Sequence, residues 1–562
     1  MPFTDPARRD FLAWCGTLGL GATAFPEALL GLVQDAPAVT RAMIEQAEKL
    51  AGLAFTDAQR AQVEQSVNEQ RATFARLRAA PLDNQVAPCL DFDPLPVGRE
   101  RPAPSPRRVR LPPAAPIAAP TEIEELAFAP VWQLAQLLRA REISSVELTE
   151  MCLDRLERHD PTLLCTVTLM RERALAQAAA ADAELDAGKW RGPLHGVPWG
   201  AKDLLYTRGV RTTFGAEPYR EQVPAFDAAV VERLDAAGAV LVAKLTLGAL
   251  AMGDQWFGGM TRNPWNPEQG SSGSSAGSAA ATAAGLVPFA IGSETLGSII
   301  SPSVRCGTTG LRPTFGRVSR HGAMALSWSM DKLGPLCRDA LDCALVFAAI
   351  EGRDPRDRST VDQGFDFDGS AGLAGLRLGY LRAGFPANAS AADKAVLDVL
   401  RAQGATFDPV DLPGAAAADL GDMLTVEAAS AFDDLTLSGG LDQLREQGPG
   451  AWPATFRSAR LIPAVEYLRA ARRRTELLAA TWQAFGDFDV IVTPPYAGGV
   501  LQLTNLTGHP ALVLPHGFSR DGTPTSITFV GRLYGEAALL RVGAVFQAAT
   551  DHHRRMPPRF AV

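Results

Sequence analysis

The sequence has 562 residues with a formal net charge of −8, and 47% of them are hydrophobic. This length is ample for a buried core, and the acidic balance argues against nucleic acid as a general partner. The cysteines show neither CxxC nor any other metal-ligand spacing, so the sequence indicates no metal centre.

The chain begins with a candidate export signal over residues 1–30. Residues 8–12, RRDFL, resemble the twin-arginine motif, and a modest apolar stretch and the A-x-A-like residues 22–24 follow. The apolar stretch is too short and too rich in glycine for a comfortable membrane span. We therefore expect a periplasmic or secreted protein that uses the export machinery. The alternative is an ordinary N-terminal helix, which would leave the protein cytoplasmic.

A helical extension is expected over residues 38–93. Hydrophobic residues recur at helical spacing between Thr40 and Arg78 and predict two amphipathic helices, the second capped at Thr56. Two helices are too few to bury a core of their own, so we expect residues 40–93 to pack on the domain that follows. Residues 94–120 are rich in proline and predict an extended, semi-rigid tether.

Residues 121–562 are expected to form one catalytic domain. Val230–Ala237 is a predicted helix and Ala239–Ala243 a predicted strand, a unit typical of a parallel or mixed sheet flanked by helices. Three further helices are expected at Pro130–Arg139, Ser145–Arg158 and Glu172–Ala187.

The catalytic domain is organised around residues 270–316, a segment rich in glycine and serine. A flexible linker would lack the alanine-rich helix predicted at Ser278–Ala284 and the buried strand predicted at Leu286–Ile291. A loop, a helix, a strand and a second glycine loop can hold two serine-bearing turns. We therefore interpret this segment as the scaffold of an active site.

Two serines on glycine turns need a base, and Lys202 is the candidate. It follows the apolar run GVPWGA in a chain that contains little lysine. Burial among such neighbours lowers a lysine pKa because desolvation disfavours the ammonium, whereas an arginine would stay protonated. A neutral lysine can take a proton from a serine hydroxyl. The alternative is a lysine at a strand edge with its head group in water.

Four segments together carry a family resemblance: GVPWGAKD, GSSGSSAGSAAATAAG, IGSETLGSI and GLRPTFGRVS. Over about residues 127–547 the chain resembles the amidase signature family of serine hydrolases. The resemblance implies an α/β amidase-signature fold, in which helical layers sandwich a large mixed β-sheet. It also implies a Ser–cis-Ser–Lys triad with Lys202 as base, Ser274 as the bridging cis-serine and Ser298 as the nucleophile. It implies no metal and no organic cofactor.

The turn before the expected nucleophile would bind the oxyanion that forms during acyl transfer. The backbone N–H groups of Thr295, Leu296, Gly297 and Ser298 are the expected donors. Glycine at position 297 lets the backbone approach the substrate closely. The resemblance also implies that the Gly273–Ser274 peptide bond is cis.

This core departs from the family pattern at three positions. Glu294, Leu296 and Ile300 stand where the family usually has Asp, Gly and Arg. The first two changes are tolerable if the backbone N–H groups, and not the side chains, bind the oxyanion. Because Ile300 cannot pair with Glu294, Arg305 is the expected replacement partner.

Large side chains near these motifs are the expected walls of the substrate pocket. They are Trp256, Phe257, Met324 and Trp328.

The N-terminal extension carries a resemblance of its own. Its two predicted helices followed by LRAAPLDNQVAP resemble the small C subunit of the tRNA-dependent amidotransferase, which wraps around a larger amidase-family partner. A generic helical hairpin is the alternative.

The sequence therefore predicts an exported serine hydrolase that cleaves carboxylic amides of small molecules, with esters and carbamates as further candidates. A homodimer is left open. One alternative is a glutamine amidase subunit that supports tRNA charging, although export would remove it from tRNA. Another is a catalytically idle binding or assembly subunit of the same fold.

A different hydrolase class is a third alternative. Residues 273–277 match G-x-S-x-G, which would make Ser275 the nucleophile of an α/β-hydrolase. That motif must follow a strand, and the two prolines before it predict a poor one. The candidate bases in this reading are His509, His516, His552 and His553.

Overall fold

The computed structural model describes residues 38–79, 81–113, 118 and 120–562. The export signal expected at residues 1–30 lies outside these ranges. The chain divides into two compact units. One comprises the residues up to Asp83 together with residues 461–463, and the other comprises residues 84–460 and 464–562. Within the described ranges, no helix is long and apolar enough to cross a bilayer.

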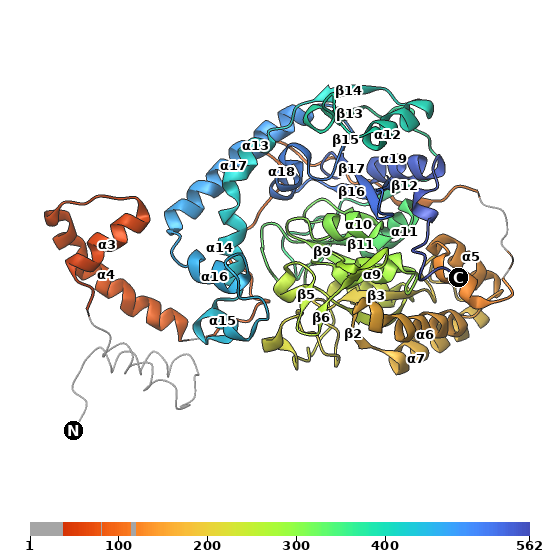
Figure 1. The fold of residues 1–562 in the computed structure, drawn as a ribbon, viewed down its shortest axis with the longest axis horizontal. Coiled ribbons are helices and arrows are strands. Elements are labelled where there is room, and N and C mark those ends of the chain that lie inside the picture. Colours follow the sequence, from red (N-terminus) through yellow and green to blue (C-terminus); the bar gives the residue numbers. More distant parts are fainter. Residues whose placement is uncertain (1–37, 80, 114–117, 119) are drawn as a thin grey trace. The chain divides into compact units, whose positions relative to one another are not determined.

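The first unit contains the two helices predicted for the extension, α3 (Arg41–Ala51) and α4 (Asp57–Arg78) (Figure 1). The Thr56 hydroxyl and the side chain three residues later form a capping box that starts α4. Glu48 is buried and accepts a hydrogen bond from Arg60 Nε at 2.9 Å, so an ion pair joins the two helices. The helical prediction is therefore confirmed.

The expected extension and tether both need correction at their ends. Residues 84–93 belong to the second unit and not to the helical unit. Within the tether, β1 (Arg107–Arg110) pairs in parallel with β12 (Phe365–Asp368). The run RRVR lies between prolines and supplies the N–H groups that a strand needs, and Arg108 adds an ion pair to Asp366 at 2.6 Å.

The second unit is built on an eleven-stranded mixed sheet with helices packed around it, which is the fold class expected (Figure 1). From one edge to the other the strands are β14 (Phe407–Val410), β13 (Leu378–Leu381), β15 (Val490–Thr493), β17 (Pro524–Gly531), β16 (Ala511–Phe518), β10 (Thr309–Arg312), β11 (Lys332–Cys337), β9 (Phe289–Glu294), β3 (Pro198–Lys202), β4 (Val240–Leu245) and β2 (Thr166–Leu169). β3 pairs in parallel with both β4 and β9, whereas β9, β11, β10, β16 and β17 pair antiparallel in that order.

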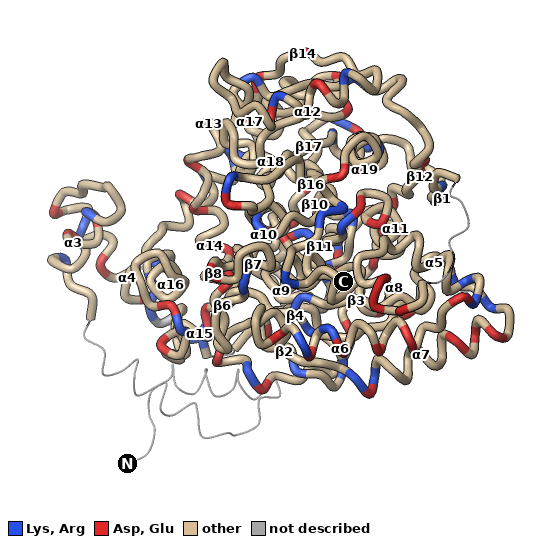
Figure 2. Tube along the Cα trace, turned by 45° about the vertical axis from the view of Figure 1, so that its right-hand side comes forward, with Lys and Arg blue, Asp and Glu red and all other residues tan. Residues whose placement is uncertain are grey.

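The helices predicted from the sequence are present, and their ends lie within five residues of the predicted ones. Those that flank the sheet are α5 (Val131–Ala140), α6 (Ser145–Leu163), α7 (Arg171–Asp186), α8 (Ala229–Ala236), α9 (Ala276–Ala283), α10 (Ile300–Cys306), α11 (Ala340–Ile350) and α19 (Glu536–Ala548). Acidic and basic residues are interspersed along α6 and α7 (Figure 2). Arg171 of α7, for example, pairs with Asp154 of α6 at 2.7 Å.

A buried apolar cluster fixes α6, α7 and α9 against β4. Burial of these side chains removes apolar surface from water, which is the main force that holds the layers together. Its members include Leu153 and Leu156 of α6, Ala174 and Ala178 of α7, Val240 and Val242 of β4, and Ala280 and Ala281 of α9. The alanines of α9 let this helix approach the sheet closely, and the Ser274 turn lies at its start.

Further helices lie among the strands after residue 352. They are α12 (Ala391–Ala402), α13 (Gly414–Ala417), α14 (Asp422–Ala431), α15 (Asp433–Leu437), α16 (Trp452–Ala459), α17 (Ala464–Phe485) and α18 (Val500–Thr507). Two short hairpins precede the Ser274 turn, β5 (Gln255–Trp256) with β6 (Gly259–Met260) and β7 (Arg262–Asn263) with β8 (Asn266–Gly270).

Candidate active site

The parallel strands β3 and β9 bring a lysine and a serine together at their carboxyl ends. β3 ends at Lys202, and Ala201 lies opposite Ile291 of β9. Ser293, two residues after Ile291, therefore reaches the Lys202 side chain. Lys202 is fully buried, so the strand-edge alternative with a solvated head group is excluded.

Three hydroxyl groups surround the Lys202 amine. Its Nζ donates to Ser274 Oγ at 2.8 Å, to Ser293 Oγ at 2.9 Å and to Ser275 Oγ at 3.0 Å. The Ser275 hydroxyl in turn donates to the carbonyl oxygen of Ser293 at 3.1 Å. The sequence predicted the contact to Ser274; it did not predict Ser275 or Ser293 as neighbours.

The surroundings of Lys202 disfavour its charged form. Burial lowers its pKa well below the usual lysine value, and the negative charges of Asp331 and Glu294 oppose this effect only in part. Among the described residues, no carboxylate lies within ion-pair distance of Nζ. A lysine in such a place can exist as the neutral amine and accept a proton.

The turn that presents Ser274 has the expected conformation. The Gly273–Ser274 peptide bond is cis. A Cβ at position 273 would lie 1.8 Å from the carbonyl oxygen of Gly253, so only glycine fits here. Asp254 fixes the same turn, because its carboxylate accepts a hydrogen bond from the Ser272 N–H at 2.9 Å.

The second serine-bearing turn lies against the first. The Ser275 N–H donates to the Ser298 carbonyl oxygen at 3.1 Å, and Gly297 has a φ of 84° that favours glycine. Within the part of the chain that the structure describes, the N–H groups of Leu296, Gly297 and Ser298 have no hydrogen-bond acceptor. Unpartnered N–H groups beside a serine are suitable donors for an oxyanion.

Glu294 holds this turn, but its partner is not the predicted one. Its Oε2 accepts hydrogen bonds from the Ile299 and Ile300 N–H groups at 2.8 and 2.9 Å. Its Oε1 accepts from Arg312 at 2.7 Å and from the Asn505 amide at 2.8 Å. Burial would raise the pKa of Glu294, but Arg312 and these donors outweigh burial and lower it to about 2.

The predicted pairing of Glu294 with Arg305 is therefore wrong. Arg305 lies in the last turn of α10 and donates to Gln269 at 3.1 Å. Glu294 binds the first N–H groups of the same helix, and Arg305, in the last turn of that helix, does not reach it. Arg312 does so from β10, which is separated from β9 by β11 alone.

A cavity of about 280 Å³ lies beside the candidate triad and is lined by Ser293, which binds Lys202, and by Thr295 and Asp331. Met324 and Trp328, two of the four predicted wall residues, line it. Thr295 Oγ1 donates to Asp331 Oδ1 at 2.5 Å, and burial raises the pKa of Asp331.

The other two predicted wall residues lie elsewhere. Trp256 is buried on the β5–β6 hairpin and packs edge-on against Phe257, with ring centroids 4.7 Å apart. Phe257 lines a different cavity of about 200 Å³. Neither of them lines the cavity at Ser293, because their short hairpin folds their side chains onto each other.

The geometry disfavours Ser275 as the nucleophile of an α/β-hydrolase. A short strand, β8, does precede its turn, contrary to the sequence-based expectation. Yet the Ser275 hydroxyl is fully buried and bound to Ser293 and Lys202. Within the described ranges no candidate histidine contacts Ser275: the Nδ1 of His509 bonds to Thr507, for instance, at 2.8 Å.

The comparisons with known proteins agree with this geometry. Residues 147–540 match the Amidase family. The chain is 38% identical over 471 residues to the A subunit of the glutamyl-tRNA(Gln) amidotransferase of Roseiflexus sp. (strain RS-1), covering 75% of this chain and 96% of that relative.

Solved structures resemble the chain over a similar span. The peptide amidase of Stenotrophomonas maltophilia is 30% identical with a TM-score of 0.69, covering 78% of this chain and 100% of that one. An amidase family protein of Bacillus anthracis is 26% identical with a TM-score of 0.69, covering 78% and 93%. The match to the Amidase family thus covers more than half of the chain, and the solved structures share its mixed α/β fold. The protein belongs to the amidase signature family and is an amide-hydrolysing enzyme.

Within the described residues, no group of three or more His, Cys, Asp or Glu side chains is arranged to hold a metal ion.

Proposed function

We propose that the protein hydrolyses carboxylic amides through an acyl-enzyme on Ser298, with Ser274 as proton relay and Lys202 as base. The observation that carries this proposal is the Lys202 amine, fully buried and 2.8 Å from the Ser274 hydroxyl on a cis peptide. A neutral Lys202 has two N–H groups and one lone pair for these three hydroxyls, and we assign the lone pair to Ser274 and the N–H groups to Ser275 and Ser293. This arrangement makes Ser274 the only one of the three hydroxyls that passes its proton to the amine.

The reaction then follows from these positions. Ser274 gives its proton to Lys202 and takes that of Ser298, whose oxygen attacks the carbonyl carbon of the amide. The N–H groups of residues 296–298 stabilise the oxyanion. The amine leaves with the proton returned from Lys202 through Ser274, and water hydrolyses the acyl-enzyme by the same route. Because an ester is an easier acyl donor than an amide, the site also suits esters and carbamates.

The test is covalent labelling of the serine with a fluorophosphonate probe. We expect the wild-type chain to label at Ser298 and Ser298→Ala to lose both labelling and amide hydrolysis. Mass spectrometry of the labelled peptide identifies the serine. Labelling at Ser275 would overturn the assignment, and absence of labelling in the wild type would favour a catalytically idle protein of the same fold.

A second candidate is a glutamine amidase that works within a larger amidotransferase, which the likeness to the glutamyl-tRNA(Gln) amidotransferase of Roseiflexus supports. Measuring glutamine hydrolysis by the isolated chain against a panel of small amides separates the two. The first candidate predicts hydrolysis without a partner protein and no preference for glutamine.

Export through the twin-arginine segment is part of the proposal. Replacement of Arg8 and Arg9 by lysine is expected to retain a fused reporter inside the cell. A reporter that stays inside with the native arginines would make the protein cytoplasmic.

A further inference from the structure

The cavity at the catalytic centre has one wall from outside the family fold. Residues 84–92 precede the matched span of 147–540, and most of them line the cavity together with Ser293 and Thr295. We name residues 84–92 the strap. The strap lies in the same compact unit as the catalytic residues.

Hydrogen bonds fasten the first end of the strap to the loop that carries Met324. The Asn84 side chain accepts from the Ala325 N–H at 2.7 Å and donates to the Ala325 carbonyl at 2.9 Å. Gln85 accepts from the Gly322 N–H at 3.1 Å. The two side-chain amides thus bind backbone N–H and C=O groups as a neighbouring strand would. They hold the strap against the loop that forms a wall of the cavity.

Aromatic and ionic contacts fasten the other end. The ring of Phe92 meets that of Phe315 edge-on at 5.0 Å, and the Arg474 guanidinium lies 3.6 Å from its centroid. Asp91 pairs with Arg358 at 3.1 Å. The strap is therefore held at both ends, while Cys89 and Leu90 face the cavity between them.

Leu90 is an apolar side chain at the mouth of the cavity with 65% of its surface exposed. Such a side chain gains stability only if something apolar covers it. Val86, on the same strap, is similarly exposed at 54% but does not line the cavity. Substitutions at Leu90 and Val86 can therefore distinguish an effect on ligand contact from an effect of changing any exposed apolar side chain.

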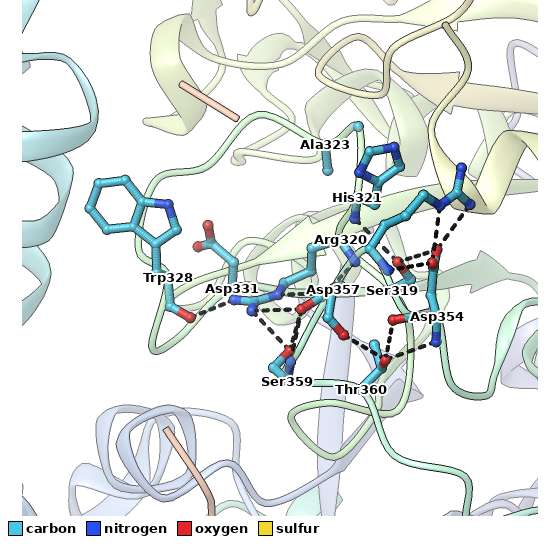
Figure 3. A network of polar contacts seen from close by, with 12 residues as sticks. Ser319, Arg320, His321, Ala323, Trp328, Asp331, Asp354, Asp357, Ser359 and Thr360 are labelled. Atoms are coloured by element: carbon cyan, nitrogen blue, oxygen red, sulfur yellow. Dashed lines mark hydrogen bonds and ion pairs between the residues drawn. The ribbon is translucent and has the colours of Figure 1, made fainter. Parts of the chain in front are cut away.

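The arginines that line the cavity are already paired with carboxylates. Arg320 is bound by Asp357, by the Ser359 hydroxyl and by the Trp328 carbonyl (Figure 3). An anionic group on the substrate would have to compete with these partners for the arginines and lose its own hydration. The ion pairs around the cavity are Arg320–Asp357, Arg356–Glu232 and Arg358–Asp91.

We propose that the strap forms the distal wall of the substrate site and selects substrates that carry no anionic group and whose far end is apolar and long enough to cover Leu90. This inference rests on the proposed amidase function and adds to it the class of substrate. Short substrates would occupy the catalytic end of the cavity without reaching the strap.

The test compares Leu90→Asp with Val86→Asp on two series of amides. One series lengthens the acyl group as an unbranched alkyl chain, and the other lengthens the amine. For Leu90→Asp we expect the ratio of kcat/KM between the longest and shortest members to fall about tenfold in one series, since burial of one leucine side chain is lost. That series also shows which half of the substrate lies in the cavity. Val86→Asp is expected to leave both ratios unchanged.

A second test uses the native folded enzyme. Among the cysteines of the described ranges, Cys89 is exposed, whereas Cys152, Cys165, Cys306, Cys337 and Cys343 are buried. An alkyl methanethiosulfonate forms a mixed disulfide with the Cys89 thiolate and releases methanesulfinate. We expect larger adducts to lower kcat/KM for long substrates progressively, and Cys89→Ser to remove this response to the reagent.

Two results would overturn the inference. One is equal length ratios in Leu90→Asp, Val86→Asp and wild type across both series. The other is an adduct effect that ignores adduct size or persists in Cys89→Ser. Failure of the proposed function is distinct, since it would appear as hydrolysis that survives Ser298→Ala.

Discussion

Two buried lysines on adjacent strands show how surroundings decide what a lysine can do. Lys202 ends β3, and Lys244 of the neighbouring β4 lies opposite Ala201, the residue before Lys202. Both are fully buried. Lys244 Nζ lies 3.0 Å from the Asp203 carboxylate and donates to Thr212 at 2.7 Å, whereas Lys202 is surrounded by serine hydroxyls.

The difference is a counter-ion. Burial lowers the pKa of both lysines, but Asp203 offsets part of the effect at Lys244, and the pKa of Lys202 falls further. A lysine that keeps a carboxylate partner serves as one half of a buried ion pair. A lysine among neutral hydroxyls can exchange a proton, which is what acyl transfer by serine requires.

The largest expected effect separates the two lysines by activity. Lys202→Met should lower the single-turnover acylation rate by about 10³-fold or more, because the proton of Ser298 then has no acceptor. Lys244→Met should acylate at a rate close to that of the wild type per folded molecule, measured by active-site titration. Equal losses of acylation rate in both variants would show that the two lysines do not differ in their role in catalysis.

The next effect separates them by stability. Lys244→Met leaves Asp203 buried without its partner and should lower the free energy of unfolding by about 3–5 kcal/mol in urea titrations. Asp203→Asn with Lys244→Met should recover part of that loss. If Lys244→Met is as stable as the wild type, Asp203 does not depend on this lysine.

Sequence reasoning located the parts of the site that short motifs define. Lys202 follows apolar residues and Ser274 follows a glycine. Apolar neighbours indicate burial and glycine indicates a tight turn, so the adjacent sequence was enough to predict both environments. The helix and strand after Ser274 were predicted within a few residues, because alanine-rich helices and short apolar strands have clear local signals.

The parts that were missed depend on strand order. Ser293 reaches Lys202 only because β9 pairs with β3, and Arg312 reaches Glu294 only because β10 lies two strands from β9. The sequence offers no signal for these pairings. The strap was missed for the same reason, since the sequence placed residues 84–92 in the helical extension and only the fold brings them to the cavity.

A third prediction tests the corrected pairing of Glu294. Arg312→Met leaves the Glu294 carboxylate short of a donor in a buried site, which should cost about 1–3 kcal/mol of stability. Since the turn at residues 296–298 depends on Glu294, acylation should also fall by about 10–100-fold. Arg305→Met is the matched control and should change neither value.

The pH dependence is a fourth, smaller effect. The pKa of Lys202 is lower in the folded chain than in the unfolded one, so the unfolded state binds more protons between these two values. The contribution of Lys202 to stability should therefore rise with pH across that window, and acylation should rise with pH through the folded pKa. Lys202→Met should flatten the stability profile relative to Lys244→Met. A Lys202→Met profile as steep as that of the wild type would mean that Lys202 is not the titrating group.

The smallest expected effect concerns the histidines that the alternative hydrolase reading requires. Burial lowers the pKa of His509 to about 3, so it stays neutral at working pH, and its Nδ1 is bound to Thr507. His516 Nε2 is bound to Asp393 at 3.0 Å, and burial lowers the pKa of His553 to about 4. Loss of a general base costs about 10²–10⁴-fold, whereas each of His509→Gln, His516→Gln, His552→Gln and His553→Gln should change acylation by less than about threefold. A single inactive histidine variant, with Lys202→Met still able to acylate, would show that the hydroxyl-bound lysine is structural and that Ser275 carries the reaction.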